Sequence, residues 1–158
     1  MANVNTPSAV PFSLKTPLAN LSGSQFIFWD IENKKGWRYD LDSGSWYPLP
    51  NKGAPNLSPR NLDPQMIAIG DKTVLGFGLE RASNKSSVVP VTKASVYDPK
   101  LDKWFPLLEK NVPRNCAGKY LATGSQLFYY GGTESCGYQP SSNGGFYNFP
   151  KGVSDANP

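Results

Sequence analysis

The stretch YDPKLDKWFPL, residues 97–107, has an earlier counterpart in the chain, YDLDSGSWYPL at residues 39–49. Both read Tyr-Asp, five residues, Trp, an aromatic residue, Pro and Leu, and the step from Tyr39 to Tyr97 is 58 residues. A repeat of that length is typical of stacked supersecondary units. The sequence therefore predicts a repeat architecture rather than one irregular domain.

A second pattern extends the repeat to the rest of the chain. Residues 113–132 read PRNCAGKYLATGSQLFYYGG and align without a gap on residues 59–78, PRNLDPQMIAIGDKTVLGFG, at an offset of 54. The stretch GSQFIFW at residues 23–29 likewise matches GSQLFYY at residues 124–130. Three units are therefore expected, each containing the same apolar strands and the same turn glycine.

The third unit lacks its last part. Tyr147 lies 50 residues after Tyr97, where another Tyr-Asp is expected, but the position of the following Trp is occupied by Ser154. Each unit is a small antiparallel meander that cannot bury both of its faces alone. We predict units of about four short strands at residues 12–50, 59–108 and 113–158, with residues 1–11 loose or forming an edge-closing strand.

The composition favours an all-β protein and excludes several classes of site. Gly and Pro number 15 each and aromatic residues make up 13% of the chain, which favours turns and strands over helices. No apolar run approaches the length of a membrane span, and the N-terminus has no apolar signal core. The net charge of +4 comes from scattered lysines, so a nucleic-acid partner is not expected. Without histidine, Ser-His-Asp and Cys-His catalysis and histidine-bound metals are excluded, and we expect no metal and no cofactor.

The two cysteines leave a question open. Cys116 and Cys136 allow one disulfide or two free thiols, and their spacing does not decide between these alternatives. A disulfide would favour a periplasmic or secreted protein, whereas the missing signal sequence favours the cytoplasm.

The two patterns together resemble the Kelch repeat. That family's pattern is Pro-Arg, an apolar strand, a turn Gly, an apolar strand ending in Gly-Gly, then Tyr-Asp and a Trp six residues after the Asp. Residues 113–132 and 96–104 carry it most fully, and the double Gly is kept only at Gly131-Gly132. The resemblance implies the blades of a β-propeller, a fold of four to eight blades. Three blades cannot close a ring, so we expect a six-bladed homodimer of halves, with a fragment of a longer chain or an engineered half as the rival.

The large aromatic residues of the repeat are expected to form the core between neighbouring blades, because each buries a large apolar area. We assign this structural role to Tyr39, Trp46, Tyr97 and Trp104. Gly131 and Gly132 belong to the same structural set, since a glycine pair usually serves a positive φ or a close approach of two backbones.

The resemblance also implies where a ligand would bind. In Kelch proteins the Arg of Pro-Arg opens the innermost strand near one mouth of the channel, which here places Arg60-Asn61 and Arg114-Asn115 at that mouth. A ring of guanidinium groups suits carboxylate or phosphate ligands. The alternative is that each Arg pairs with a nearby carboxylate, such as Asp63. Loop residues that would line the same rim are Arg81, Glu134 and Tyr138.

Three functions follow as hypotheses. The leading one is a non-enzymatic binding module that presents a basic channel mouth to a protein, a peptide or an anionic sugar. A second is an enzyme resembling the bacterial Kelch-type sialic-acid mutarotases, in which Arg, Glu and Tyr at the mouth open and close a sugar hemiacetal. The third is a half-propeller whose role is self-assembly. Kelch-like copper oxidases need histidine ligands, which this chain lacks.

Overall fold

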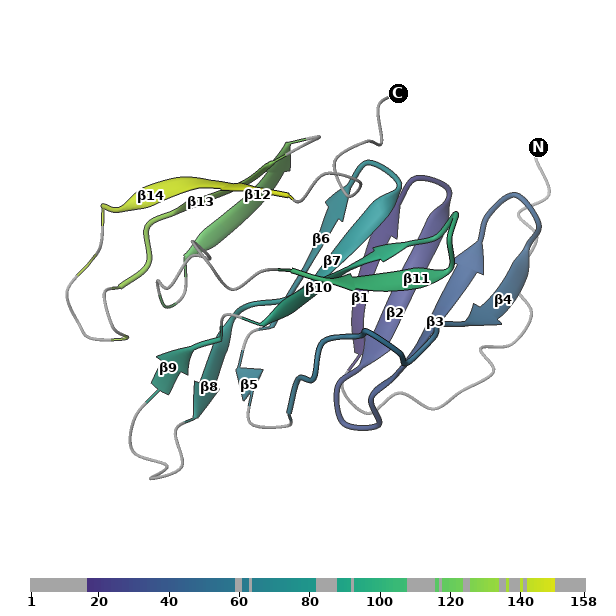
Figure 1. Cartoon of the computed structure of the whole chain (residues 1–158), viewed down its shortest axis with the longest axis horizontal. Coiled ribbons are helices and arrows are strands. Elements are labelled where there is room, and N and C mark those ends of the chain that lie inside the picture. The colour runs from purple at the N-terminus through teal and green to yellow at the C-terminus, as the bar shows by residue number, and fades with distance from the viewer. Residues whose placement is uncertain are drawn as a thin grey trace, which may run out of the picture.

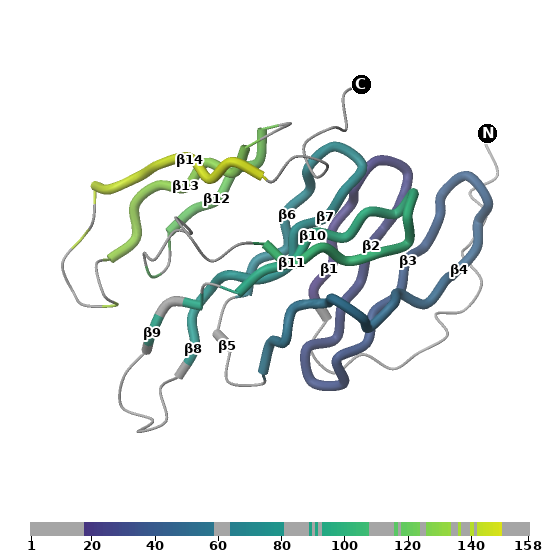
Figure 2. Tube along the Cα trace, viewed as in Figure 1, coloured from purple at the N-terminus to yellow at the C-terminus, as the bar shows by residue number. Residues whose placement is uncertain are grey.

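All the secondary-structure elements of the described residues are β-strands. The computed structural model describes residues 17–58, 61–62, 64–81, 88–91, 93–107, 116, 118–123, 126–133, 136, 140 and 142–149. The expected edge-closing strand at residues 1–11 lies outside these residues. The strands within them form antiparallel sheets that follow one another along the chain (Figure 2).

Three of the sheets are meanders that correspond to the three predicted units (Figure 1). Sheet 1 has the order β1-β2-β3-β4, with the strands Pro17–Ser22, Gln25–Asp30, Lys35–Asp40 and Ser45–Pro48. Sheet 2 has the order β6-β7-β10-β11, with the strands Gln65–Ile69, Lys72–Gly76, Ala94–Asp98 and Lys103–Pro106. Sheet 3 has the order β12-β13-β14, with the strands Lys119–Thr123, Gln126–Tyr130 and Gly144–Asn148.

A fourth, smaller sheet was not expected. It has the order β5-β8-β9, with the strands Asn61–Leu62, Leu79–Arg81 and Val88–Pro90. The Kelch resemblance implied that Pro-Arg-Asn opens the innermost strand of the second unit. In the structure that innermost strand begins at Gln65, and Asn61 instead pairs with Glu80 of β8.

Local chemistry explains why the Tyr-Asp pair recurs. The Asp40 side chain accepts a hydrogen bond from the Ser43 N–H at 2.8 Å, and Asp98 accepts one from the Lys100 N–H at 2.9 Å. Each aspartate therefore holds the turn that follows its strand. The Ser43 N–H also keeps the pKa of Asp40 below its usual value, because it stabilises the carboxylate form.

The three meanders stack through their faces. The first strands lie next to one another, β1 against β6 and β6 against β12, so sheet 2 is the middle of the stack (Figure 1). Successive residues of sheet 2 point to opposite sides, as the pleat of a strand requires. Leu75 and Tyr97 belong to the core shared with sheet 1, and Val74 and Val96 belong to the core shared with sheet 3.

The core between sheets 1 and 2 is built around two tryptophans. Trp29 and Trp104 meet edge to face, with ring centroids 5.4 Å apart and an interplanar angle of 77°, and both are almost completely buried. Tyr97 packs beside Trp104 and donates a hydrogen bond to Asp102 at 2.6 Å. Two of the four aromatic residues assigned to the blade core, Tyr97 and Trp104, therefore lie between two sheets.

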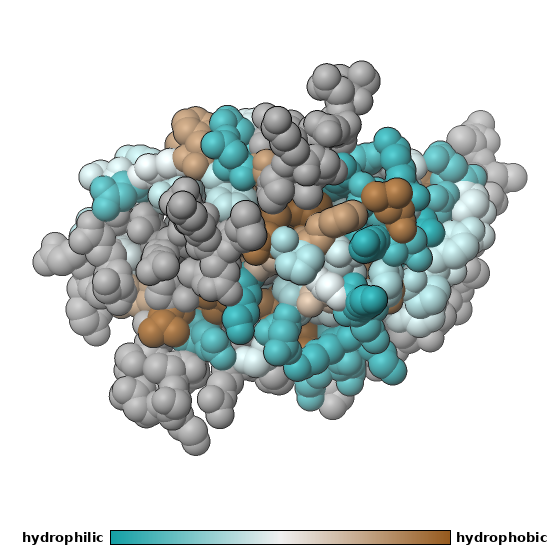
Figure 3. All heavy atoms as spheres, viewed as in Figure 1, coloured by the Kyte–Doolittle hydropathy of each residue, from teal (hydrophilic) through white to brown (hydrophobic). Residues whose placement is uncertain are grey.

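The other two assigned residues occupy the equivalent positions of sheet 1. Tyr39 and Trp46 pack against each other, with centroids 4.9 Å apart, on the face of sheet 1 that points away from sheet 2. Hydrophilic residues cover much of the side of the molecule where β3 and β4 lie (Figure 3). Gly131 and Gly132 both have positive φ, at 72° and 82°, directly after β13.

Replacing Trp104 by Ala is expected to lower the free energy of unfolding by about 3–5 kcal/mol, because it opens a cavity at the junction of sheets 1 and 2. Urea denaturation followed by circular dichroism measures the change. Leu101→Ala, in the exposed β10–β11 turn, is the control and should change stability by no more than about 0.5 kcal/mol. Equal losses in the two variants would contradict this packing.

The alkaline stability of the fold is expected to depend on Tyr97. Burial, together with the hydrogen bond to Asp102, raises the pKa of this phenol above its usual value. Below pH of about 10 the phenol is protonated in both the folded and the unfolded chain; above it only the unfolded chain loses the proton, so stability falls by up to about 1.4 kcal/mol per pH unit. Tyr97→Phe should flatten the curve of unfolding free energy between pH 9 and 11, whereas Tyr130→Phe, on an exposed position, should leave its slope unchanged. An unchanged slope in Tyr97→Phe would contradict the assignment.

Candidate functional site

The connections at the two opposite ends of the strands differ in length. At one end, the turn end, the strands are joined by short turns at residues 23–24, 41–44, 70–71 and 99–102. At the other end, the loop end, residues 49–64 cross from sheet 1 to sheet 2, residues 77–93 join β7 to β10, and residues 131–143 join β13 to β14. Rigid strands that carry long loops at one end are the usual arrangement of a binding surface.

The small sheet leaves sheet 2 through a sharp bend. Gly76, Phe77 and Gly78 all have positive φ, at 144°, 56° and 87°. Within the bend the Phe77 N–H donates a hydrogen bond to the Lys93 carbonyl, so the backbone hydrogen bonding between the two strands continues into β8 and β9. A left-handed phenylalanine is costly. Its fully buried ring stacks on Tyr120 of sheet 3 at 5.5 Å, and this packing holds it in place.

The loop end of sheet 3 is fixed by a covalent bond. Cys116 and Cys136 form a disulfide, with Cα atoms 4.9 Å apart, which resolves the alternative that the sequence left open. Cys116 and Thr133 also exchange two backbone hydrogen bonds, of 3.1 and 2.9 Å. A side chain at Gly132 would meet the backbones of Cys116 and Gly118, so only glycine fits there. The loop after β13 is therefore tied to the segment just before β12.

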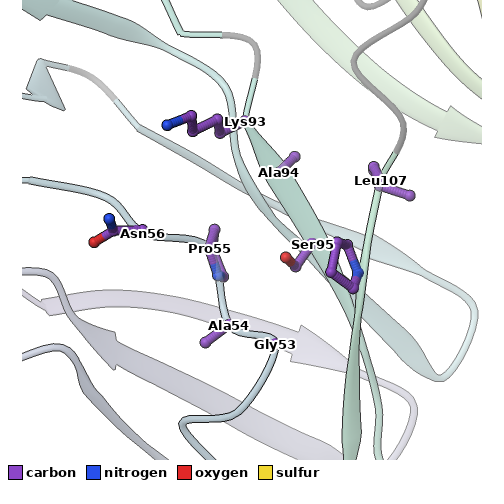
Figure 4. Close-up of a pocket in the computed structure, with 9 residues that line it drawn as sticks. Gly53, Ala54, Pro55, Asn56, Lys93, Ala94, Ser95 and Leu107 are labelled. Carbon is purple, nitrogen blue, oxygen red and sulfur yellow. The ribbon is translucent and has the colours of Figure 1, made fainter.

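A cleft of about 240 Å³ lies at the loop end, between the crossing segment and sheet 2 (Figure 4). The lining residues are Gly53, Ala54, Pro55, Asn56, Lys93, Ala94, Ser95, Pro106 and Leu107. Pro55, Ala94 and Leu107 form an apolar wall. The side chains of Asn56 and Lys93 extend to the same side, and both residues are exposed. The cleft thus combines an apolar surface with a hydrogen-bonding amide and a cation.

The amide of Asn56 is held by a second lysine. Lys34, in the turn between β2 and β3, donates a hydrogen bond from Nζ to Oδ1 of Asn56 at 2.7 Å. Lys34, just before β3 of sheet 1, and Lys93, just before β10 of sheet 2, therefore both lie at the loop end. This arrangement favours ligands with a carboxylate or another anionic group.

A second cleft of about 240 Å³ lies at the turn end and is lined by Ser22, Ser24, Gln25, Asp71, Pro99 and Lys100. Its charges already satisfy each other, since Lys100 Nζ lies 2.8 Å from Asp71 Oδ2. The hydrogen bond to Asp71 raises the pKa of the Lys100 ammonium. The cleft at the turn end is therefore the weaker candidate for binding a charged ligand.

A buried ion pair serves the fold rather than a site. Lys72 and Asp98 lie 3.3 Å apart, and both side chains are nearly inaccessible. Asp98 also accepts hydrogen bonds from two backbone N–H groups of the β10–β11 turn. Such a pair is retained because leaving one charge alone would be very unfavourable. Among the described residues, no group of three or more acidic or cysteine side chains is arranged to hold a metal ion.

Only some of the predicted mouth residues belong to the described part of the chain. Arg60, Arg114, Asn115, Glu134 and Tyr138 lie outside the described residues, so their roles stay predictions. The backbones of Asn61 and Arg81 lie in β5 and β8, in the small sheet of the loop end. The sequence did not point to Asn56, Lys93 or Lys34, because a Pro/Asn-rich connection and two isolated lysines carry no motif. Only the crossing segment packed on sheet 2 brings them together.

Comparisons with known proteins bear on the fold. No family model and no curated protein matches this chain. Solved structures do match, 69 chains in all. One of them is YjhT. The match to YjhT has a TM-score of 0.52 over 77% of this chain, at 12% sequence identity.

The likeness to YjhT shows the fold alone. It supports an all-β, β-propeller-like arrangement of the stacked sheets. This chain spans only 35% of the YjhT chain, so the matched region is about a third of that structure. In the described part of this chain, no helix is long and apolar enough to cross a membrane.

The disulfide is expected to stabilise the protein by about 2–4 kcal/mol, because it closes a loop with a sequence separation of 20 residues in the unfolded chain. The double variant Cys116→Ser, Cys136→Ser should lose that much unfolding free energy in urea denaturation. A reductant should destabilise the natural chain by the same amount and leave the double variant unchanged. A reductant effect on the double variant would show that the loss has another origin.

Proposed function

We propose that this chain is a Kelch-like β-propeller segment that acts as a non-enzymatic binding module and presents its loop end to an anionic protein, peptide or sugar. The observation that carries the proposal is the contrast between the two ends of the stack. Short turns close one end, while the small sheet, the crossing segment and the disulfide-tied loop gather at the other. Irregular backbone concentrated at one end of a set of rigid strands, as at the loop end here, is typical of recognition surfaces.

The charge at the loop end supports an anionic ligand. Lys93 stands at the rim of the cleft, and Lys34 reaches the same region through Asn56. The Kelch resemblance implies that Arg60, Arg81 and Arg114 line the same mouth. Guanidinium groups bind carboxylates and phosphates through paired hydrogen bonds, so the set favours acidic side chains or acidic sugars over neutral ones.

The proposal includes the assembly in which the module acts. Two copies of the chain would place six such sheets in one ring, a number within the usual range of propellers, and would double the number of basic loops around one mouth. The paired cysteines favour an oxidising compartment, either the periplasm or the outside of the cell.

Binding is tested by calorimetric titration with three probes: a hexaglutamate peptide, glucuronate and glucose. We expect the two acidic probes to bind, with an affinity that falls as salt rises, and glucose not to bind. The triple variant Arg60→Ala, Lys93→Ala, Arg114→Ala should weaken binding of the acidic probes at least about tenfold, because it removes three of the cations assigned to the loop end. The matched control is Lys100→Ala at the turn end, where the lysine is already paired with Asp71.

Two results would overturn the proposal. One is the absence of binding by both acidic probes at millimolar concentration in protein that is folded by circular dichroism. The other is an equal loss of affinity in the control variant, which would place the ligand away from the loop end. Equal binding of glucose and glucuronate would retain a binding module but contradict its preference for anions.

A further inference from the structure

The cleft at the loop end lies where the repeat changes from a large to a small residue. In sheet 1, Trp37 lies opposite Pro48 across β3 and β4. The equivalent pair of sheet 2, 58 residues later, is Ser95 and Pro106. A hydroxymethyl group thus takes the place of an indole. The crossing segment fills only part of the space beside it, and the remainder is the cleft of about 240 Å³.

The crossing segment forms a fixed wall opposite Ser95. Gly53 has a positive φ of 83°, and a Cβ at this position would lie 2.8 Å from the Trp104 carbonyl oxygen, so the segment lies directly on β11. Leu57, which follows the wall, is buried in the core between sheets 1 and 2. In Figure 4 the Ser95 hydroxyl points from β10 toward Pro55. The packing of both walls therefore forms the cleft before a ligand binds.

The interior of the cleft suits an aliphatic group. Pro55 is buried in one wall, and Pro106 lies beside Ser95 on the neighbouring strand. Six of the nine described lining residues have no polar side-chain atom, and none of the nine is aromatic or acidic. The volume of about 240 Å³ is below the range of about 300–1,000 Å³ that is usual for clefts holding drug-sized molecules. The cleft therefore has room for a group the size of one side chain.

The polar side chains at the rim of the cleft are hydrogen-bond donors. Lys34 Nζ donates to Asn56 Oδ1 at 2.7 Å, which fixes the orientation of the amide and leaves its Nδ2 group to donate. Lys93 is exposed at the same rim. The ion pairs between described residues use Lys72 and Lys100 but not Lys93. A carboxylate can accept hydrogen bonds from both an amide and an ammonium group, so it matches this rim.

We propose that the cleft binds a peptide in which an aliphatic residue lies next to an acidic one. The aliphatic side chain, leucine or valine in size, enters between Pro55 and Pro106, and the carboxylate accepts hydrogen bonds from Lys93 and Asn56 at the rim. This inference rests on the proposed function, in which the loop end binds an anionic partner, and it names that partner as a peptide. An acidic sugar would place hydroxyl groups against the prolines, where burial without a hydrogen-bond partner is unfavourable.

Two hexapeptides that differ in one residue test the inference by calorimetric titration of the whole chain. One is hexaglutamate, and the other has leucine at its third position. The leucine peptide carries one negative charge less, so attraction by the basic loops alone predicts weaker binding. We expect it instead to bind at least about tenfold more tightly, because its aliphatic side chain leaves water for the cleft.

A third peptide tests the need for the acidic neighbour. It retains the leucine and has glutamine in place of every glutamate. We expect it to bind at least about tenfold more weakly than the leucine peptide, because glutamine offers no charge to Lys93.

The repeat provides matched controls for variants of the cleft. Pro106→Glu places a carboxylate in its wall, and Pro48→Glu places one at the equivalent position of sheet 1, which does not line the cleft. Lys93→Met removes the cation of the rim, and Lys35→Met removes the lysine 58 residues earlier. The two cleft variants should bind the leucine peptide at least about tenfold more weakly, and the two controls should change its affinity by about twofold or less. All four residues are exposed, so the variants should fold, which circular dichroism checks.

Three outcomes contradict the inference: hexaglutamate that binds as tightly as the leucine peptide, a glutamine peptide that binds as tightly as the leucine peptide, or equal losses in Pro106→Glu and Pro48→Glu. The failure of this inference can be told apart from the failure of the proposed function. Binding of hexaglutamate without a preference for leucine removes the aliphatic residue from the cleft and retains a loop end that binds anions. Absence of binding by both acidic peptides removes both.

Discussion

A small antiparallel meander has two apolar faces, and neither can be buried within the meander itself. This constraint organises the whole chain. Sheet 2 satisfies it completely, because Leu75 and Tyr97 are buried on one side while Val74 and Val96 are buried on the other. The two outer sheets are packed on one side against sheet 2, and on their other sides Phe26 of sheet 1 and Tyr130 and Phe146 of sheet 3 are exposed.

The turns of the repeat make the stacking reproducible. Asp40 and Asp98 each fold the chain back through hydrogen bonds to backbone N–H groups, and the fifth residue after each tyrosine, Gly44 or Asp102, takes a left-handed conformation. The strand after the turn then returns with its Trp beside the Tyr, at centroid distances of 4.9 and 5.2 Å in the two sheets. The motif is therefore a turn that places the Trp side chain at the same position, beside the Tyr, in both sheets.

The sequence was sufficient for the parts of the fold that repeat. Strand periodicity, turn glycines and the Tyr-Asp motif predicted three stacked meanders, and both the sheet order and the likeness to YjhT support an all-β, β-propeller-like fold. The small sheet was missed because β8 and β9 have only 3 residues each and lie at the two ends of a polar stretch, and β5 has only 2 residues. The Gly-x-Gly before it reads as a strand end, and nothing in the residues shows that Phe77 adopts a left-handed conformation held by Tyr120. The cleft was missed for a related reason, since Asn56 and Lys93 line the same cleft only because residues 49–64 cross from sheet 1 to sheet 2.

The bend at Gly76-Phe77-Gly78 divides one antiparallel strand pair into a part that belongs to sheet 2 and a part that belongs to the small sheet. Before the bend, β7 and β10 belong to the middle of the stack, where every residue is buried. After it, the hydrogen bonds from Phe77 to Lys93 and from Val91 to Gly78 close the hairpin at its base. Changes in length or sequence beyond Arg81 are expected to leave sheet 2 unchanged, because the hydrogen-bonded corner lies between them and the sheet. The chain thus has a position at which a loop can be exchanged while sheet 2 keeps its geometry.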